Sequence, residues 1–70
     1  MYRLIKMNMK TQKIKEGEIV KIDPTVTGEN EWIEGVVIDV ENNPFRGVVI
    51  SIKDKIGRIF WAEKNNFLPA

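Results

Sequence analysis

The sequence contains neither cysteine nor histidine. Without cysteine, no disulfide can stabilise the fold and no cysteine-based zinc site can form. Without histidine, the chain lacks the commonest general base and the commonest protein ligand of transition metals. Ser51 therefore has no partner that would make it a nucleophile. The composition predicts a protein that is not an enzyme and that holds no cofactor and no metal.

Long apolar runs are also absent. No stretch approaches the roughly 20 residues that a membrane span requires. Residues 1–15 carry basic side chains but lack the continuous apolar core of a signal peptide. The absence of cysteine fits a reducing compartment. We therefore expect a cytoplasmic protein that does not contact a membrane, and its 70 residues allow one domain.

The charged residues are segregated along the chain, although the net charge is only +1. Residues 1–15 hold five basic residues and no acidic one, whereas residues 16–44 hold eight acidic residues and one lysine. Residues 45–70 hold five basic and two acidic residues. Such segregation can steer a charged partner, or it can attract one part of the fold to another.

Five short runs rich in β-branched and aromatic residues predict an all-β fold, because turn signals separate them at regular intervals. The expected strands cover residues 18–22, 32–40, 46–53, 58–62 and 67–68. An exposed loop is expected over 24–31, a turn over 41–44, a tight hairpin over 54–57 and one helical turn over 63–66. Five short strands are too few for a sandwich, so the sequence predicts a small barrel over residues 16–70.

Strand alternation predicts which side chains face the core. In the second run, Val36, Ile38 and Val40 share one parity and are expected to point inward. Gly35 within that run predicts a bulge or a bend.

The same alternation divides the third and fourth strands. Val48, Ile50 and Ile52 are expected on one face of the third strand. In the fourth, Phe60 shares a face with Ala62, and the opposite face carries Ile59 and Trp61.

Residues 1–15 form a basic N-terminal arm for which the sequence leaves three alternatives open. The arm can be an added strand, a short helix or a disordered segment, since chain termini fray unless tied down.

The strand pattern from residue 16 to residue 69 resembles the Src-homology-3-like barrels, including the small KOW-type and Tudor-type modules and short proteins of bacteria and their phages. A long loop follows the first strand, a tight hairpin joins the third and fourth, and one helical turn leads to a closing Phe67-Leu68-Pro69. The resemblance implies a single five-stranded barrel that acts as a binding module.

A shorter resemblance concerns the opening of the domain. Gly17-Glu18-Ile19-Val20, followed by Asp23-Pro24-Thr25-Val26, is similar to the start of the MazF-type endoribonuclease toxins. The Arg-Pro pair that precedes the second strand in that family is missing here, and Trp32-Ile33-Glu34-Gly35 stands in its place. No catalytic residue is therefore carried over to this chain.

Trp61 and its neighbour Ile59 form the first candidate site. If Phe60 points inward, alternation turns Trp61 outward, where an indole can stack on a base or a proline ring. The alternative is that Trp61 belongs to the core or lies beneath the N-terminal arm.

Basic residues around the hairpin form the second candidate site, namely Arg46, Lys53, Lys55 and Arg58. Basic groups interleaved with aromatic ones suit single-stranded nucleic acid. The leading hypothesis is a nucleic-acid or nucleoprotein-binding module. The alternatives are a solvated face without a ligand, and a protein-interaction or oligomerising module that includes a homodimer.

Overall fold

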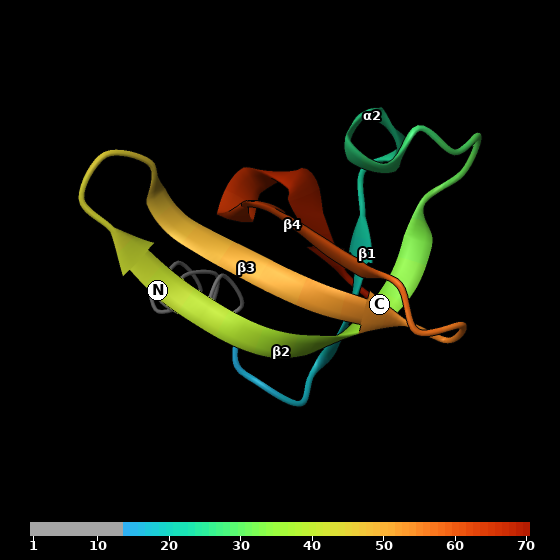
Figure 1. Ribbon diagram of the computed structural model, residues 1–70, viewed down its shortest axis with the longest axis horizontal. Helices are drawn as coiled ribbons and strands as arrows, with labels where there is room; N and C mark the ends of the chain where they lie inside the picture. Colours follow the sequence, from blue (N-terminus) through green and yellow to red (C-terminus); the bar gives the residue numbers. More distant parts are fainter. Residues whose placement is uncertain (1–13) are drawn as a thin grey trace, which may run out of the picture.

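The computed structural model describes residues 14–70, which fold into an antiparallel sheet with two short helical turns (Figure 1). Its elements, in chain order, are β1 (Ile19–Ile22), α2 (Pro24–Thr27), β2 (Ile33–Asn43), β3 (Gly47–Asp54), β4 (Ile59–Glu63), the 3-10 helix η1 (Lys64–Asn66) and β5 (Phe67–Pro69). The prediction of an all-β fold with five strands is confirmed. The predicted helical turn before the last strand is confirmed as η1. The predicted N-terminal arm lies outside the described residues, except for Ile14 and Lys15.

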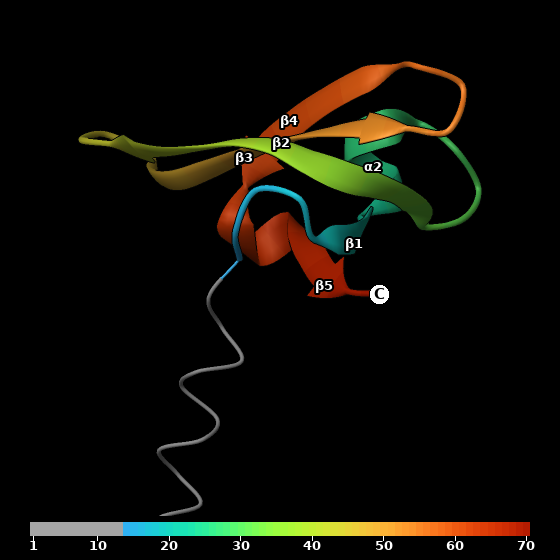
Figure 2. The same cartoon turned by 90° about the horizontal axis from the view of Figure 1, so that it is seen from below.

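The strands form one sheet in the order β4-β3-β2-β1-β5. In the side view, β4 lies at one extreme of the sheet, and β1 and β5 lie at the other (Figure 2). Among residues 14–70, β4 pairs only with β3, and β5 pairs only with β1. Strand pairing therefore leaves the sheet open at both edges and does not close it into the predicted barrel. No helix in this part of the chain has the length and apolarity to cross a membrane.

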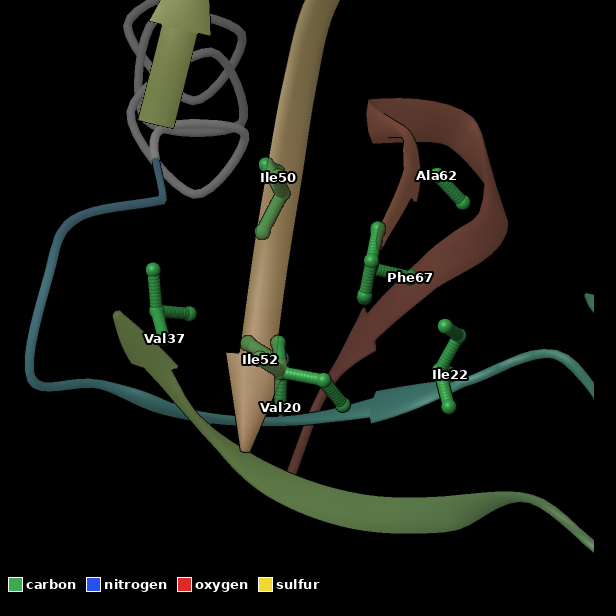
Figure 3. Close-up of a cluster of buried hydrophobic side chains, with 7 residues drawn as sticks. All are labelled: Val20, Ile22, Val37, Ile50, Ile52, Ala62 and Phe67. Atoms are coloured by element: carbon green, nitrogen blue, oxygen red, sulfur yellow. The ribbon is translucent and has the colours of Figure 1, made fainter. Parts of the chain in front are cut away.

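The core lies on the concave, inner face of the sheet (Figure 3). It consists of buried side chains contributed by all five strands, namely Val20, Ile22, Val37, Ile50, Ile52, Ala62 and Phe67. Val48 and Phe60 pack against this cluster, and so does Ile14 from the segment before β1. The predicted faces of the third and fourth strands are therefore confirmed. Burial of these apolar groups is the main stabilising contribution that so short a chain can make.

The predicted inward face of β2 is wrong for its first two residues. Val36 and Ile38 are 42% and 41% exposed, whereas Val37 between them is buried. The register with β3 shifts between Val37 and Asp39, which makes Ile38 the extra residue of a β-bulge. Beyond the bulge the parity is reversed, so Val40 turns inward opposite Ile50 as predicted.

Gly35 allows β2 to approach β3 closely, and it is not the bulge that the sequence suggested. A Cβ atom at this position would lie 2.7 Å from Ile52 Cδ1 and 2.9 Å from the backbone oxygen of Lys53. Gly35 pairs with Val20 on one side and Asp54 on the other. A residue without a side chain is therefore required where three strands meet over the core.

Two predicted boundaries are also wrong. The segment 24–31 was expected to be a loop, but its first four residues form α2, because Pro24 suits a first helical turn and the Asp23 carboxylate accepts from Thr25 N–H. Val26 of this helix packs against the core.

The second strand continues to Asn43. The side-chain amide oxygen of Asn43 accepts from the backbone N–H of Phe45 and Arg46 and holds a tighter turn than expected.

The close approach at Gly35 predicts that Gly35→Ala destabilises the protein by about 1–3 kcal/mol, since the new methyl group meets rigid backbone. Val36→Ala is the matched control, because its side chain is partly exposed on the opposite face, and it should cost less than about 1 kcal/mol. Urea unfolding followed by tryptophan fluorescence measures both. Equal midpoints for the two variants would contradict the packing argument.

Candidate binding surfaces

The outer face of the sheet, opposite the core, carries an apolar patch. Ile19, Val36, Lys53 and Ile59 are direct cross-strand neighbours in one row across β1, β2, β3 and β4. The three apolar members of the row are all exposed, and so is Trp61 on the next outward position of β4. Lys53 separates Ile59 from Val36 in this row, but apolar groups gathered on one surface still indicate an interaction site more strongly than scattered ones do.

Trp61 occupies the end of this patch beside the turn between β2 and β3. Its side chain is 55% exposed, so the alternative that it belongs to the core is wrong for this structure. The Arg46 guanidinium carbon lies 5.2 Å from the centre of the indole ring, a cation–π distance. Arg46 Nε also donates to Glu63 Oε2 over 3.3 Å. Beneath them Val49 is buried although it faces outward, and it shares a shallow hollow with Arg46 and Trp61.

A separate open pocket of about 470 Å³ lies between the start of β2 and the β3–β4 hairpin. Its walls combine apolar and charged side chains, namely Lys21, Trp32, Ile33, Glu34, Asp54, Lys55, Ile56 and Arg58.

Arg58 is restrained in this pocket by three contacts. Its Nε donates to Asp54 Oδ2 over 2.8 Å, its Nη1 donates to Glu29 Oε2 over 3.1 Å, and its guanidinium carbon lies 5.2 Å from the centre of the Phe60 ring.

Asp54 fixes the hairpin from its base. Its side chain is almost fully buried, and Oδ1 accepts from the backbone N–H of Ile56 and Arg58 over 3.2 and 2.7 Å. Burial alone would raise the pKa of this carboxyl, but the hydrogen bonds from Arg58 and Ile56 and the charge of Arg58 outweigh burial and lower the pKa. The carboxylate is thus an integral part of the turn.

The six residues predicted as a site belong to two places. Ile59, Trp61 and Lys53 share the outer face, and Arg46 stacks on Trp61 beside them. Lys55 and Arg58 line the hairpin pocket instead. Both arginines are engaged by carboxylates, which reduces the positive charge that they present to a ligand.

Trp32 lines the hairpin pocket and was missed as a candidate site residue. A tryptophan between a polar loop and a strand indicates a candidate binding residue, because a large apolar side chain at that position lies at the rim of the sheet. No group of acidic residues within the described part of the chain is arranged to hold a metal ion.

The backbone of β4 presents a free edge, which follows from the alternation of hydrogen bonds in antiparallel pairs. Asp54 N–H donates to Arg58 C=O over 2.9 Å, so the polar backbone groups of Arg58 point toward β3. Two and four residues further on, Phe60 and Ala62 also bond to β3. The backbone N–H and C=O of Ile59, Trp61 and Glu63 therefore point away from the sheet.

An independent bond pattern supports this assignment. Phe60 lies opposite Ile52, and Ile52 lies opposite Val37. If the backbone groups of Ile52 form hydrogen bonds with Phe60, they point away from Val37, and the backbone of Val37 needs other partners. The Val37 N–H does donate to Glu18 C=O, and the Val37 C=O accepts from Gly17 N–H. Within residues 14–70, α2 approaches β4 but makes no backbone hydrogen bond with it.

The two edges of the sheet are protected to different degrees. The strand β5 has only three residues and ends with Pro69, which has no N–H to offer. The strand β4 has five residues, Ile-Phe-Trp-Ala-Glu, without proline or lysine. Natural sheets usually blunt an edge of this kind with proline, lysine or a bulge.

The Asp54 contacts predict a pH dependence of stability. Because folding lowers the pKa of Asp54, its contribution is fully present above the ordinary value of 3.8 and is lost as the pH falls through the lowered pKa. Asp54→Asn should destabilise the protein at pH 7 and flatten the loss of stability between pH 5 and pH 2. Urea unfolding across this range measures both effects, with Asp39→Asn on the exposed outer face as the control. An unchanged pH profile in Asp54→Asn would disprove this role.

Comparisons with known proteins identify no relative of this chain, since no family model, no curated protein and no solved structure matches it.

Proposed function

We propose that this chain is a protein-interaction module that binds an extended polypeptide segment by strand addition to β4. The observation that carries the proposal is the free edge, where the N–H and C=O groups of Ile59, Trp61 and Glu63 point outward in a strand without proline or bulge. An added strand pairs with such groups through main-chain hydrogen bonds, which supply affinity with little dependence on sequence.

Side chains next to this edge supply the apolar contacts. Ile59 and Trp61 stand on the outer face, 57% and 55% exposed, where a side chain of an added strand lies directly opposite. The Arg46 guanidinium lies over the indole from one side and is itself held by the Glu63 carboxylate. The Trp61 ring is therefore partly preorganised, which lowers the entropy cost of binding.

We also propose that the sheet belongs to an Src-homology-3-like barrel. The order β4-β3-β2-β1-β5, the bulge in the long β2 strand and the η1 turn between β4 and β5 support this assignment. In such a barrel β2 bends so that its two halves serve two small sheets, and bulges supply that bend.

A short blocked peptide of alternating threonine and valine tests strand addition, because it pairs readily but carries no charge. Its titration should shift and protect the amide signals of Ile59, Trp61 and Glu63 in NMR spectra, and Phe60 and Ala62 should stay bonded to β3. Ile59→Pro should weaken this binding by about tenfold or more, which corresponds to about 1.4 kcal/mol. Proline is tolerated there because Ile59 opens an edge strand and its N–H points outward.

Ile59→Ala is the matched control, since it shortens the side chain and keeps the backbone donor. The same peptide N-methylated on the residues that face β4 should not bind. Equal binding by the methylated and unmethylated peptides would overturn strand addition, and so would the absence of any amide shift at millimolar peptide.

Nucleic-acid binding is the second candidate function. It is favoured by exposed Trp61, by the stacked Arg46, and by the exposed side chains of Lys53 and Lys55. Against it, carboxylates engage both arginines, and Asp39 and Glu41 carry negative charge on the same face of the sheet as Trp61. A phosphate backbone would approach that face against local repulsion.

Titration with short single-stranded DNA and RNA at about 50 mM and about 200 mM salt separates the two candidates, because phosphate contacts weaken steeply as salt rises. For nucleic-acid binding through this face, the affinity should fall at the higher salt, and Trp61→Ala should lower it further by removing base stacking. A complete lack of binding at the lower salt would exclude this candidate.

A further inference from the structure

We infer that the strand added to β4 is β4 of a second copy of this chain, in a two-fold antiparallel arrangement centred on Trp61. The inference rests on the proposed function, since it names the partner of the same edge.

The spacing of the outward groups is self-complementary. Ile59, Trp61 and Glu63 lie two residues apart, with Trp61 in the middle of the strand. When a second β4 runs antiparallel with the two-fold axis at Trp61, each Trp61 faces the other, and each Ile59 faces Glu63 of the other copy. All three pairs are of the hydrogen-bonded type, so every outward N–H and C=O in both strands finds a partner. Neighbouring two-fold registers leave at least one of these residues unpaired.

Side chains across the seam are also compatible. On the outer face the two Trp61 rings come together, and aromatic cross-strand pairs stabilise antiparallel sheets. Glu63 of one copy lies opposite Ile59 of the other, and the next position in that row is Lys53, which pairs with Ile59 in its own sheet. Ile59 therefore lies between Lys53 of its own sheet and Glu63 of the other copy, which carry opposite charges. Between the two β4 strands, no like charges lie opposite each other.

Inner-face contacts are mainly apolar, with one like-charge contact at each end of the seam, where Arg58 of one copy lies opposite Lys64 of the other. Phe60 of one copy lies opposite Ala62 of the other in this register, so a large and a small apolar side chain meet beneath the seam. The Arg58 guanidinium is already held by Asp54 and Glu29, which directs it to its own hairpin.

The interface is small. Two five-residue strands and one tryptophan pair cover less than the roughly 1,200 Å² at the lower end of stable complexes, so we expect a reversible dimer in the micromolar range or weaker. The whole chain is the appropriate sample, because the dimer must form in the presence of residues 1–13.

Sedimentation equilibrium of the full chain between about 5 and about 500 µM tests the inference. The apparent mass should rise with concentration toward that of two chains. In NMR spectra, amide exchange at Ile59, Trp61 and Glu63 should slow as concentration rises, whereas exchange at Phe60 and Ala62 should not change. Ile59→Pro should stay monomeric, with at least a tenfold weaker association, and Ile59→Ala should still associate.

Trp61→Phe and Trp61→Lys provide a second test that does not depend on proline. The phenylalanine keeps an aromatic pair at the axis, and the lysine places two like charges directly opposite each other, so only Trp61→Lys should prevent association. Thermal unfolding of each variant checks that it is folded.

Three outcomes are distinguishable. A chain that remains monomeric at about 500 µM but binds the threonine–valine peptide at β4 overturns the second copy as partner and leaves strand addition intact. A dimer that persists in Ile59→Pro and in Trp61→Lys lies elsewhere and also overturns the inference. If neither dimer nor peptide binding is observed, the proposed function fails together with its partner.

Discussion

The contact between Gly35 and β3 is the constraint on which the rest of the molecule depends. At this point the backbone of β2 lies so close to Ile52 and Lys53 that no Cβ fits between them. Because β2 is here paired on both sides, the same contact sets the position of β1 and β3 relative to each other. Ile52 can then pack with Val20 and Val37 in the core. In a chain without disulfides, such close packing replaces a covalent constraint.

Closure of the core on the inner face has a direct effect on the outer face. Every strand contributes its inward residues to one small cluster, and few of the elements in the described part of the chain remain to cover the opposite side. Val36, Ile38, Ile59 and Trp61 are therefore left at the surface. Charge does not compensate for this exposure, because Arg46 and Arg58 are each engaged by acidic side chains. Among residues 14–70, β4 therefore combines exposed apolar side chains with an outer backbone edge that no other strand pairs, and both properties support the proposed polypeptide partner.

Local alternation was sufficient for the strands that have no irregularity. It predicted that Ile50 and Ile52 share one face and that Phe60 and Trp61 lie on opposite faces, because a strand turns successive side chains to opposite faces. Which of Phe60 and Trp61 points inward was left open by the sequence. Alternation failed for Val36 and Ile38, since a bulge adds one residue and reverses the parity, and nothing in a run of valines and isoleucines marks where the extra residue lies. Gly35 gave a signal, but glycine serves both bulges and close approaches.

The candidate site was only partly predictable for a different reason. The pairing of Trp61 with Ile59 on one face follows from the strand itself, whereas the restraint on Arg58 depends on Glu29, which is 29 residues away in the sequence. The bond between Arg46 and Glu63 likewise joins the β2–β3 turn to the end of β4. Sequence spacing shows the number of basic residues in a region, but their availability depends on contacts that only the fold creates.

The unequal edges of the sheet bear on how this protein avoids aggregation. A sheet with two open edges can recruit a strand at each side, and every addition exposes a new edge, which is the geometry of fibril growth. Here Pro69 and the three-residue length of β5 block one side. A strand of another polypeptide added to β4 would still present its own outer edge, whereas two copies of this chain joined through β4 would leave only the blocked β5 edges exposed. In that arrangement growth would stop after one step, so the five-residue β4 edge could stay open without leading to polymerisation.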